Sequence, residues 1–192
     1  MEINSLDGIT SSIKDGEPVM LVHKLSGGYG RRDGDLQVVN LTVAQTTDRS
    51  DYFRMRLAGR HRGNNLYTFE SLQVDAQGNR IDPKPVVMSA NPVNVGDGIQ
   101  WAVAQKLSDD SCSNVVRAQY WYVLPQPTGG YAILSYLNPV FALGLYTKSV
   151  ILPVCGRPDE TVYGVIPDMC RWEIIAPNSC KGCIENQRTT AA

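Results

Sequence analysis

The segment QYWYVLPQPTGGYAILSYL, residues 119–137, reads as a β-hairpin and decides the fold. Both halves are rich in aromatic and branched side chains, which favour the pleated surface of a strand. Between them lie Pro125, Pro127, Gly129 and Gly130, residue types that are typical of a chain reversal.

The same hairpin pattern occurs twice more in the chain. YFRMRL, residues 52–57, leads through Gly59 and Gly63 to LYTFESL, residues 66–72. RWEII, residues 171–175, leads through Asn178 to CIEN, residues 183–186. Three copies of one pattern indicate an internally repeated structure.

Shared landmarks divide the chain into three units. Each unit begins with a Pro-Val pair and reaches the aromatic residue that opens its hairpin 33 to 36 residues later; the prolines are Pro18, Pro85 and Pro139, and the aromatic residues are Phe53, Trp121 and Trp172. Each unit carries one more apolar run, in residues 36–45, 99–105 and 149–154, and residues 2–6 correspond to residues 69–72. Each unit therefore contains about four short strands, and we expect Trp121 and Trp172 to be core residues.

Helical periodicity is scarcely visible. No segment holds a 3.6-residue apolar period over three turns, and the 11 prolines and 17 glycines fall between the strand candidates. Units of this size cannot each bury a face alone, so we expect them to close around a shared core. The sequence predicts an all-β protein with one domain in residues 1–176 and a polar tail in residues 177–192.

This repeat resembles the β-trefoil, with three pseudo-repeats of about four strands. Gln119-Tyr120-Trp121 is similar to the Gln-x-Trp element of ricin-B-type lectins. That resemblance implies a non-catalytic lectin that binds carbohydrate through surface loops. Aromatic faces, amides and carboxylates bind sugars. By position, the carbohydrate-binding candidates are Tyr29 with Asp33; Asn91, Asn94 and Asp97 with Trp101; and Tyr146 with Tyr163.

A second family with the same architecture also resembles this chain. The loop at residues 26–30 and the closing segment at residues 166–174 are similar to those of the mycocypins, fungal β-trefoil inhibitors of cysteine proteases. The alternative function is therefore a cysteine or serine protease inhibitor of mycocypin or Kunitz-like type. Its inhibitory loop would contain Ser26, Gly27, Gly28 and Tyr29. A structural or assembly protein is a third hypothesis, and a homodimer stays open.

Charge and hydropathy limit the partners. The formal net charge is −1 with both signs interspersed, so we expect no nucleic-acid partner. The densest basic patch, Arg54, Arg56, Arg60, His61 and Arg62, is interpreted as a solvated strand face and loop tip, with anion binding as the less favoured alternative. No run is long enough to cross a bilayer, and the first residues lack the pattern of a secretion signal. We expect a cytoplasmic protein, or a secreted one supplied in processed form.

The five cysteines are Cys112, Cys155, Cys170, Cys180 and Cys183. We interpret them mainly as free thiols in a reducing compartment, with a Cys155–Cys170 bridge open if the protein is secreted. The CxxC pair at the C-terminal end favours a structural or incidental role over zinc, because two further ligands at a recognisable spacing are missing. We expect no metal and no cofactor.

Nothing in the sequence favours catalysis. The two histidines, His23 and His61, lie in an apolar strand and at a loop tip, and neither belongs to a recognisable catalytic motif. Alternation through residues 22–24 is compatible with a surface position for His23, which leaves a ligand role open. The partners expected are glycans or a protease.

Overall fold

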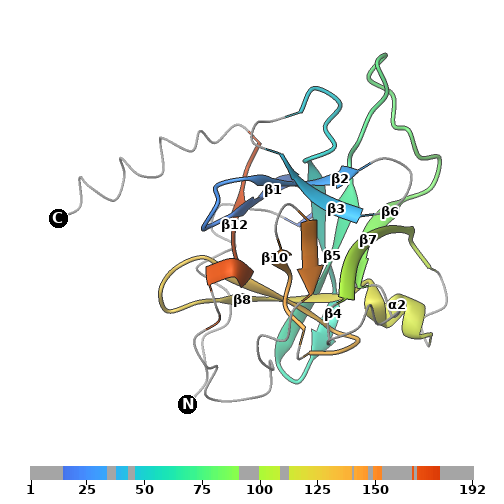
Figure 1. Ribbon diagram of the computed structural model, residues 1–192. Coiled ribbons are helices and arrows are strands. Elements are labelled where there is room, and N and C mark those ends of the chain that lie inside the picture. Colours follow the sequence, from blue (N-terminus) through green and yellow to red (C-terminus); the bar gives the residue numbers. More distant parts are fainter. Residues whose placement is uncertain are drawn as a thin grey trace.

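Twelve strands, a short helix and a 3-10 helix make up the described part of the chain (Figure 1). The computed structural model describes residues 15–33, 38–42, 46–90, 100–108, 113–139, 141–146, 149–152, 166 and 168–177. In chain order the elements are β1 (Pro18–His23), β2 (Tyr29–Asp33), β3 (Val38–Thr42), β4 (Phe53–His61), β5 (Asn64–Ser71), β6 (Val86–Ala90), β7 (Gln100–Lys106), α2 (Asn114–Ala118), β8 (Trp121–Pro125), β9 (Tyr131–Ser135), β10 (Gly144–Tyr146), β11 (Ser149–Leu152), η1 (Asp168–Cys170) and β12 (Arg171–Ile175).

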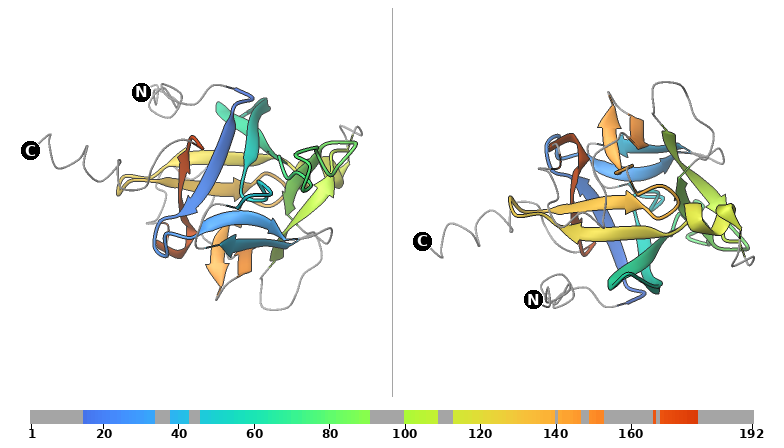
Figure 2. Two further views of the ribbon diagram at one scale, coloured as in Figure 1. Left: turned by 90° about the horizontal axis from the view of Figure 1, so that it is seen from above. Right: turned by 90° about the horizontal axis from the view of Figure 1, so that it is seen from below.

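Six of the strands form a closed antiparallel barrel. β1 pairs with β4 and β12, β5 pairs with β4 and β8, and β9 pairs with β8 and β12. The first and last strands therefore lie side by side, as both views of Figure 2 show. Every barrel strand has a partner on each side, so the barrel exposes no edge to other chains.

The other six strands form three hairpins, β2–β3, β6–β7 and β10–β11. Strands β3, β7 and β11 also pair with one another in a triangle. Each hairpin bridges to one barrel strand: β2 to β1, β6 to β5, and Ala142, ahead of β10, to Leu134 of β9. A six-stranded barrel with three such hairpins is a β-trefoil, so the predicted all-β fold class is confirmed.

Strand register reveals which parts of the three units are equivalent. Val19 lies opposite Phe53, Tyr67 opposite Trp121, and Tyr131 opposite Trp172. These pairs make β1, β5 and β9 equivalent to one another, and β4, β8 and β12 likewise.

The correspondence drawn from the Pro-Val pairs is wrong. Pro18 opens β1, a barrel strand, whereas Pro85 precedes β6, the first strand of a cap hairpin. A shared dipeptide is a local likeness, while strand pairing decides equivalence. Residues 183–186, expected to form a hairpin with residues 171–175, lie outside the described residues, while β12 itself pairs with β1 and β9. Residues 2–6 lie outside the described residues.

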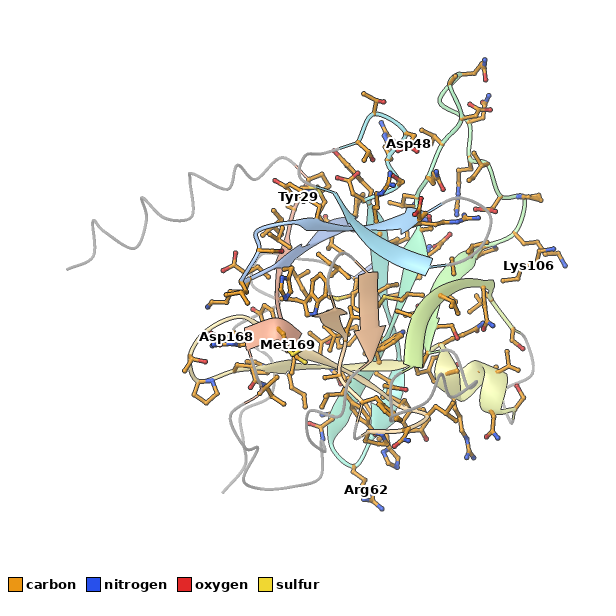
Figure 3. The ribbon with its side chains drawn as sticks, in the orientation of Figure 1. Tyr29, Asp48, Arg62, Lys106, Asp168 and Met169 are labelled. Atoms are coloured by element: carbon orange, nitrogen blue, oxygen red, sulfur yellow. The ribbon has the colours of Figure 1, made fainter. Side chains whose placement is uncertain are left out.

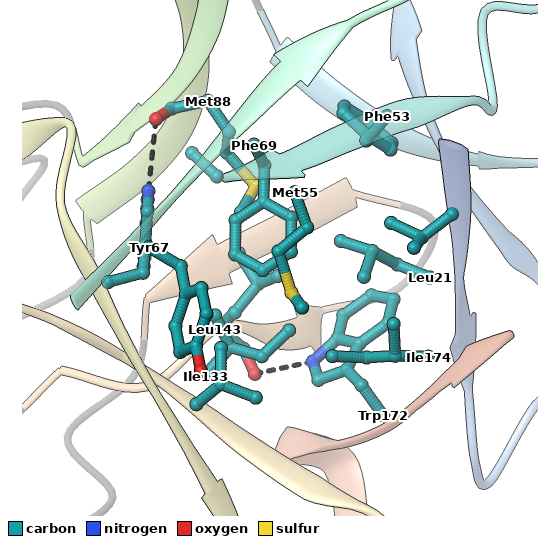
Figure 4. Packing of buried hydrophobic residues seen from close by; sticks show 14 of the residues in the cluster. Leu21, Phe53, Met55, Tyr67, Phe69, Met88, Ile133, Leu143, Trp172 and Ile174 are labelled. Carbon is teal, nitrogen blue, oxygen red and sulfur yellow. Dashed lines mark hydrogen bonds between the residues drawn. The ribbon is translucent and has the colours of Figure 1, made fainter. Parts of the chain in front are cut away.

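Phe53, Trp121 and Trp172 belong to the central core cluster and are at most 2% exposed, so the prediction that the two tryptophans are core residues is confirmed. Trp121 Nε1 donates to the carbonyl of Met88 at 3.0 Å, and Trp172 Nε1 donates to the carbonyl of Leu143 at 2.8 Å (Figure 4). Both carbonyls lie where a cap hairpin begins, so each indole ties the cap to the barrel. The side chain of Phe53 has no N–H group and cannot make this bond.

The hairpin predicted in residues 119–137 is present as β8 and β9. Gly129 and Gly130 have φ angles of 85° and 78°, in the region that glycine adopts without strain. A Cβ atom on Gly130 would lie 2.9 Å from the carbonyl oxygen of Trp172. The turn therefore packs closely against β12, which explains why a glycine stands there.

Helix α2, ahead of β8, was not expected from the sequence. Ser113 caps it, because its hydroxyl accepts from the N–H of Val116 at 3.3 Å. Gln119, the first residue of the Gln-x-Trp element, is fully buried; its amide donates to the Lys106 carbonyl at 2.8 Å and accepts from the Ser108 N–H at 3.1 Å. In this chain that glutamine fastens α2 to the end of β7.

We predict that Trp172→Phe lowers the free energy of unfolding by about 2 to 3 kcal/mol, because the change leaves the Leu143 carbonyl unpaired and removes buried ring atoms. Trp121→Phe should behave similarly. Urea denaturation followed by far-UV circular dichroism measures both. Val115→Ala, at a position 49% exposed, is the control and should change stability by less than about 0.5 kcal/mol. Wild-type stability in both tryptophan variants would contradict the role assigned to the indole bonds.

Candidate functional site

The tyrosine pocket, a hollow of about 370 Å³, is lined by Glu17, Pro18, Arg49, Tyr52, Leu72, Ala176 and Pro177. Its residues come from the start of β1, the turn before β4, the end of β5 and the end of β12. These segments meet because β1 lies between β4 and β12 in the barrel.

Aromatic and charged side chains share the tyrosine pocket. Tyr52 is half-buried and packs against the cluster of Met20, Val22, Tyr29 and Ile175, so its ring is held in place. Glu17 and Arg49 are exposed. Neither makes a side-chain hydrogen bond or an ion pair with any residue that the structure describes. The pocket therefore offers an aromatic surface, one carboxylate acceptor and one guanidinium donor to a ligand.

A dense hydrogen-bond network holds the turn that carries Arg49 and Tyr52. Asp48 accepts from the Ser50 N–H at 3.0 Å and from the Gln73 amide at 3.0 Å. The Tyr52 N–H donates to the Arg49 carbonyl at 3.1 Å. Arg49 has a φ of 55°, an unfavourable region for a residue with a Cβ atom, and the network maintains it.

The same network shifts the acidity of Asp48. Burial raises the pKa of its carboxyl group, but hydrogen bonds from Ser50, Thr46 and Gln73 outweigh burial and lower the pKa to about 2. Asp48 is therefore ionised at neutral pH and favours the folded turn.

The arginine pocket, of about 380 Å³, is lined by Arg54, Arg56, Thr68, Glu70, Arg80, Pro85, Val87 and Leu107. It divides the basic patch noted in the sequence. Arg54 and Arg56 belong to this pocket together with Arg80, whereas Arg62 lies at the tip of the β4–β5 hairpin, far from Asp48 (Figure 3).

The glycine-containing loop between β1 and β2 is a tight turn. The His23 N–H donates to the Gly28 carbonyl at 2.8 Å, and the Gly27 N–H donates to the His23 carbonyl at 2.7 Å. The Ser26 hydroxyl accepts from the Gly28 N–H at 3.2 Å. Leu25 is 67% exposed at the top of the turn, a residue that the sequence analysis did not single out.

The surface position that alternation left open for His23 is excluded, because its side chain is fully buried. One ring nitrogen, Nδ1, lies 2.9 Å from the Ser26 hydroxyl and 3.2 Å from the Ser26 N–H, while Nε2 lies 3.1 Å from the Met169 carbonyl. Burial lowers the pKa of His23, although the bond to Met169 raises it. The neutral ring therefore fastens this turn to η1, whose residues Asp168 and Met169 lie beside it in Figure 3.

Several predicted carbohydrate-binding residues are not available as proposed. Tyr29 is only 7% exposed, so its ring cannot serve as a platform for a sugar, and for the same reason it cannot enter a protease cleft. Asp33 is exposed but pairs with Arg31 at 3.2 Å. Asn91, Asn94, Asp97 and Tyr163 lie outside the described residues, and of Trp101 and Tyr146 only the backbone is described.

Cys170 is disulfide-bonded, so the free-thiol prediction is wrong for this residue. The other four cysteines lie outside the described residues, and the CxxC pair is among them. Within the described ranges no three acidic, histidine or cysteine residues cluster as metal ligands would. Nor does any helix there have the length and apolar character to cross a membrane.

No protein-family model and no curated protein sequence matches the chain. Solved structures do match its fold. A designed threefold-symmetric protein, ThreeFoil, superposes with a TM-score of 0.53 and 14% identity over 82% of this chain and 97% of its own. The BEL β-trefoil gives a TM-score of 0.55 and 14% identity over 85% of this chain and 95% of its own.

An arabinofuranosidase complexed with arabinofuranosyl-α-1,2-xylobiose also matches, with a TM-score of 0.57 and 14% identity. That match covers 86% of this chain but only 32% of the enzyme, so the present chain spans about a third of the enzyme's length. At such identities the likeness shows the β-trefoil fold alone. Membership of the ricin-B-type or mycocypin families stays a prediction.

We predict that Asp48→Asn makes the free energy of unfolding less dependent on pH in the acidic range. The pKa of Asp48 in the folded protein, about 2, lies below its ordinary value of 3.8. The contribution of Asp48 to the free energy of unfolding is therefore complete above about pH 4 and is lost as the pH falls toward 2. Urea denaturation between pH 7 and pH 2 should show a less stable variant at pH 7 and a smaller difference between the two proteins at pH 2. Parallel curves would contradict the network assigned to Asp48.

Proposed function

We propose that the protein is a non-catalytic carbohydrate-binding β-trefoil and that the tyrosine pocket is its sugar site. The observation that carries this proposal is the juxtaposition of the Tyr52 ring with the exposed Glu17 and Arg49 in one hollow. A sugar ring presents one face of C–H groups and an edge of hydroxyl groups. The first suits an aromatic surface, and the second suits a carboxylate acceptor and a guanidinium donor.

Preorganisation supports the same site. The network around Asp48 holds the backbone of Arg49 and Tyr52 before any ligand arrives, so binding has to order the Glu17 and Arg49 side chains but not the turn. The volume of about 370 Å³ lies at the lower end of the range of small-molecule sites, which suits one or two sugar units.

The matched structures add a fold-level argument. One of them is an arabinofuranosidase solved with a bound oligosaccharide, in which a part of similar fold forms about a third of the chain. This is an analogy of fold and carries less weight than the pocket itself. The disulfide at Cys170 favours an oxidising compartment over the cytosol, where extracellular glycans would be the ligands.

A non-catalytic role agrees with the surroundings of the histidines. The His23 and Ser26 side chains lie within hydrogen-bond distance, as a nucleophile and its base would. However, Nδ1 of His23 also faces the Ser26 N–H, and the other ring nitrogen meets a carbonyl. This pair closes a turn. His61 Nδ1 lies 2.6 Å from the Tyr122 hydroxyl, and among the described residues His61 forms no hydrogen bond with a serine or cysteine.

Protease inhibition is the second candidate, and one observation favours it. The turn at residues 24–28 is fixed by hydrogen bonds from within and still presents Leu25 at 67% exposure. A rigid loop with an exposed apolar tip can enter a cleft with little loss of entropy.

We predict that Arg49→Gly weakens glycan binding by about tenfold, because it removes a charged hydrogen-bond donor. Glycine adopts the φ of 55° without strain, so stability should stay equal or rise. Arg62→Gly is a matched control, since Arg62 has a φ of 49° and the same charge but lies at the far tip of the β4–β5 hairpin. A glycan array followed by titration calorimetry measures both variants.

Two results would refute the sugar site: no saturable glycan binding by the wild-type protein, or equal loss of binding in Arg49→Gly and Arg62→Gly. Equal loss would mean that net charge, and not the tyrosine pocket, governs binding.

For the inhibitor hypothesis we predict that Leu25→Asp abolishes inhibition of papain-like or trypsin-like proteases while leaving glycan binding unchanged. A charged carboxylate at the tip would have to be desolvated in an apolar subsite. Inhibition assays at stoichiometric concentrations measure the effect. Absence of inhibition by the wild-type protein removes this candidate.

A further inference from the structure

The outer face of the β4–β5 hairpin differs from the two equivalent faces of the barrel. Register places Arg54 opposite Glu70 and Arg56 opposite Thr68 on this face. The equivalent residues are Tyr122, Leu134, Leu124 and Ala132 on β8–β9, and Glu173, Val22, Ile175 and Met20 on β12–β1. Those two faces are mostly apolar and belong to buried clusters. Of these three faces, only that of β4–β5 carries three charged side chains among these four positions.

Glu70 is at the centre of these charges. Its side chain is 6% exposed, and three arginines surround it: Arg80 Nη1 lies 2.7 Å from Oε1, while Arg54 Nη1 and Arg56 Nε lie 3.4 and 3.6 Å from Oε2. A buried carboxylate is costly even when it is paired. Because Val22 and Leu134 take the equivalent positions in the other units, the barrel does not require a carboxylate here. Glu70 is better explained as the group that gathers the arginines.

The cluster carries an excess of positive charge. Three guanidinium groups face one carboxylate, and among the described residues no ion pair compensates the other two positive charges. Arg80 is well satisfied, since it also donates to the Ser71 carbonyl at 3.0 Å. Among the described residues the Arg54 and Arg56 side chains form hydrogen bonds or ion pairs only with Glu70, so most of their N–H donors stay available. Arg56 is 52% exposed, which gives its guanidinium access to a ligand from solvent.

The rest of the arginine pocket is not charged. Pro85, Val87 and Leu107 form an apolar wall, and Leu107 is 41% exposed. Thr68 adds a hydroxyl group beside Arg56. A bare inorganic anion would leave this wall unused. A ligand with an oxyanion, a C–H face and hydroxyl groups would use every part of the lining.

We propose that the arginine pocket binds an acidic sugar unit, one that carries a carboxylate or sulfate group. This inference rests on the proposed carbohydrate-binding function and names a ligand class for a second site. Arg54 and Arg56 hold the oxyanion through charged hydrogen bonds, and Glu70 positions them. Pro85 and Leu107 contact the apolar face of the ring, and Thr68 contacts a hydroxyl group.

The test is calorimetric titration of the full chain with methyl β-D-glucuronide and with methyl β-D-glucoside, which differ only in the carboxylate. We expect the glucuronide to bind at least about tenfold more tightly, and Arg54→Gln and Arg56→Gln each to weaken its binding by about tenfold. Affinity should fall several-fold between about 0.1 M and about 1 M NaCl, since the Debye length shortens from ~10 Å to ~3 Å. Arg60→Gln, an exposed arginine of the same strand outside the pocket, is the matched control and should bind as the wild type does.

Four outcomes would overturn the proposal. They are absence of glucuronide binding, equal affinity for the glucoside, retained binding in the Arg54→Gln/Arg56→Gln double variant, and an equal loss in Arg60→Gln. Inorganic sulfate is titrated in parallel, and if it binds as tightly as the glucuronide, the pocket takes a bare anion and the sugar part of the inference fails. Failure of the proposed function is distinguishable, because Arg49→Gly leaves the arginine pocket intact and should affect only glycans that bind the tyrosine pocket.

Discussion

The structure depends on one interaction repeated three times: a large aromatic ring at the start of β4, β8 and β12 packs into the barrel opposite a residue of β1, β5 or β9. In two units the ring is an indole, and its N–H reaches a carbonyl at the base of a cap hairpin. That bond joins two layers of the fold that otherwise meet through few strand pairs. Because the core is shared by all three units, no unit is expected to fold alone.

The sequence was sufficient to predict the class of fold but not the equivalence of its strands. The local composition of a hairpin is distinctive, so the hairpin in residues 119–137 and the burial of Trp121 and Trp172 in the core could be predicted. Which strands are equivalent between units depends on how the strands pair. The Pro-Val pairs therefore gave a wrong correspondence, because Pro18 opens a barrel strand whereas Pro85 precedes a cap strand. The complete burial of His23 was missed for a related reason: its ring packs against Trp172 and bonds to the Met169 carbonyl, which lies 146 residues away in the chain.

The candidate sites show the same limit. Alternation along β4 and β5 suffices to place Arg54, Arg56 and Glu70 on one face, so half of the arginine pocket was within reach of sequence reasoning. Arg80 was not, because it comes from the irregular segment between β5 and β6. The tyrosine pocket could not be predicted from the sequence, because Glu17, Tyr52 and Pro177 meet only when the last strand of the barrel pairs with the first.

Both pockets have lining residues in or next to β4 and β5. Tyr52 and Leu72 of the tyrosine pocket lie two residues from Arg54 and Glu70 of the arginine pocket, and a strand advances by about 3.3 Å per residue, so these neighbouring lining residues are about 7 Å apart along the hairpin. That separation is comparable with the length of one sugar unit. If both proposals hold, one glycan with a neutral unit beside an acidic unit would occupy both pockets, and the second binding event would be intramolecular. Such a ligand would bind more tightly than either unit alone, and losing either Arg49 or Arg56 would reduce its affinity toward that of a single unit.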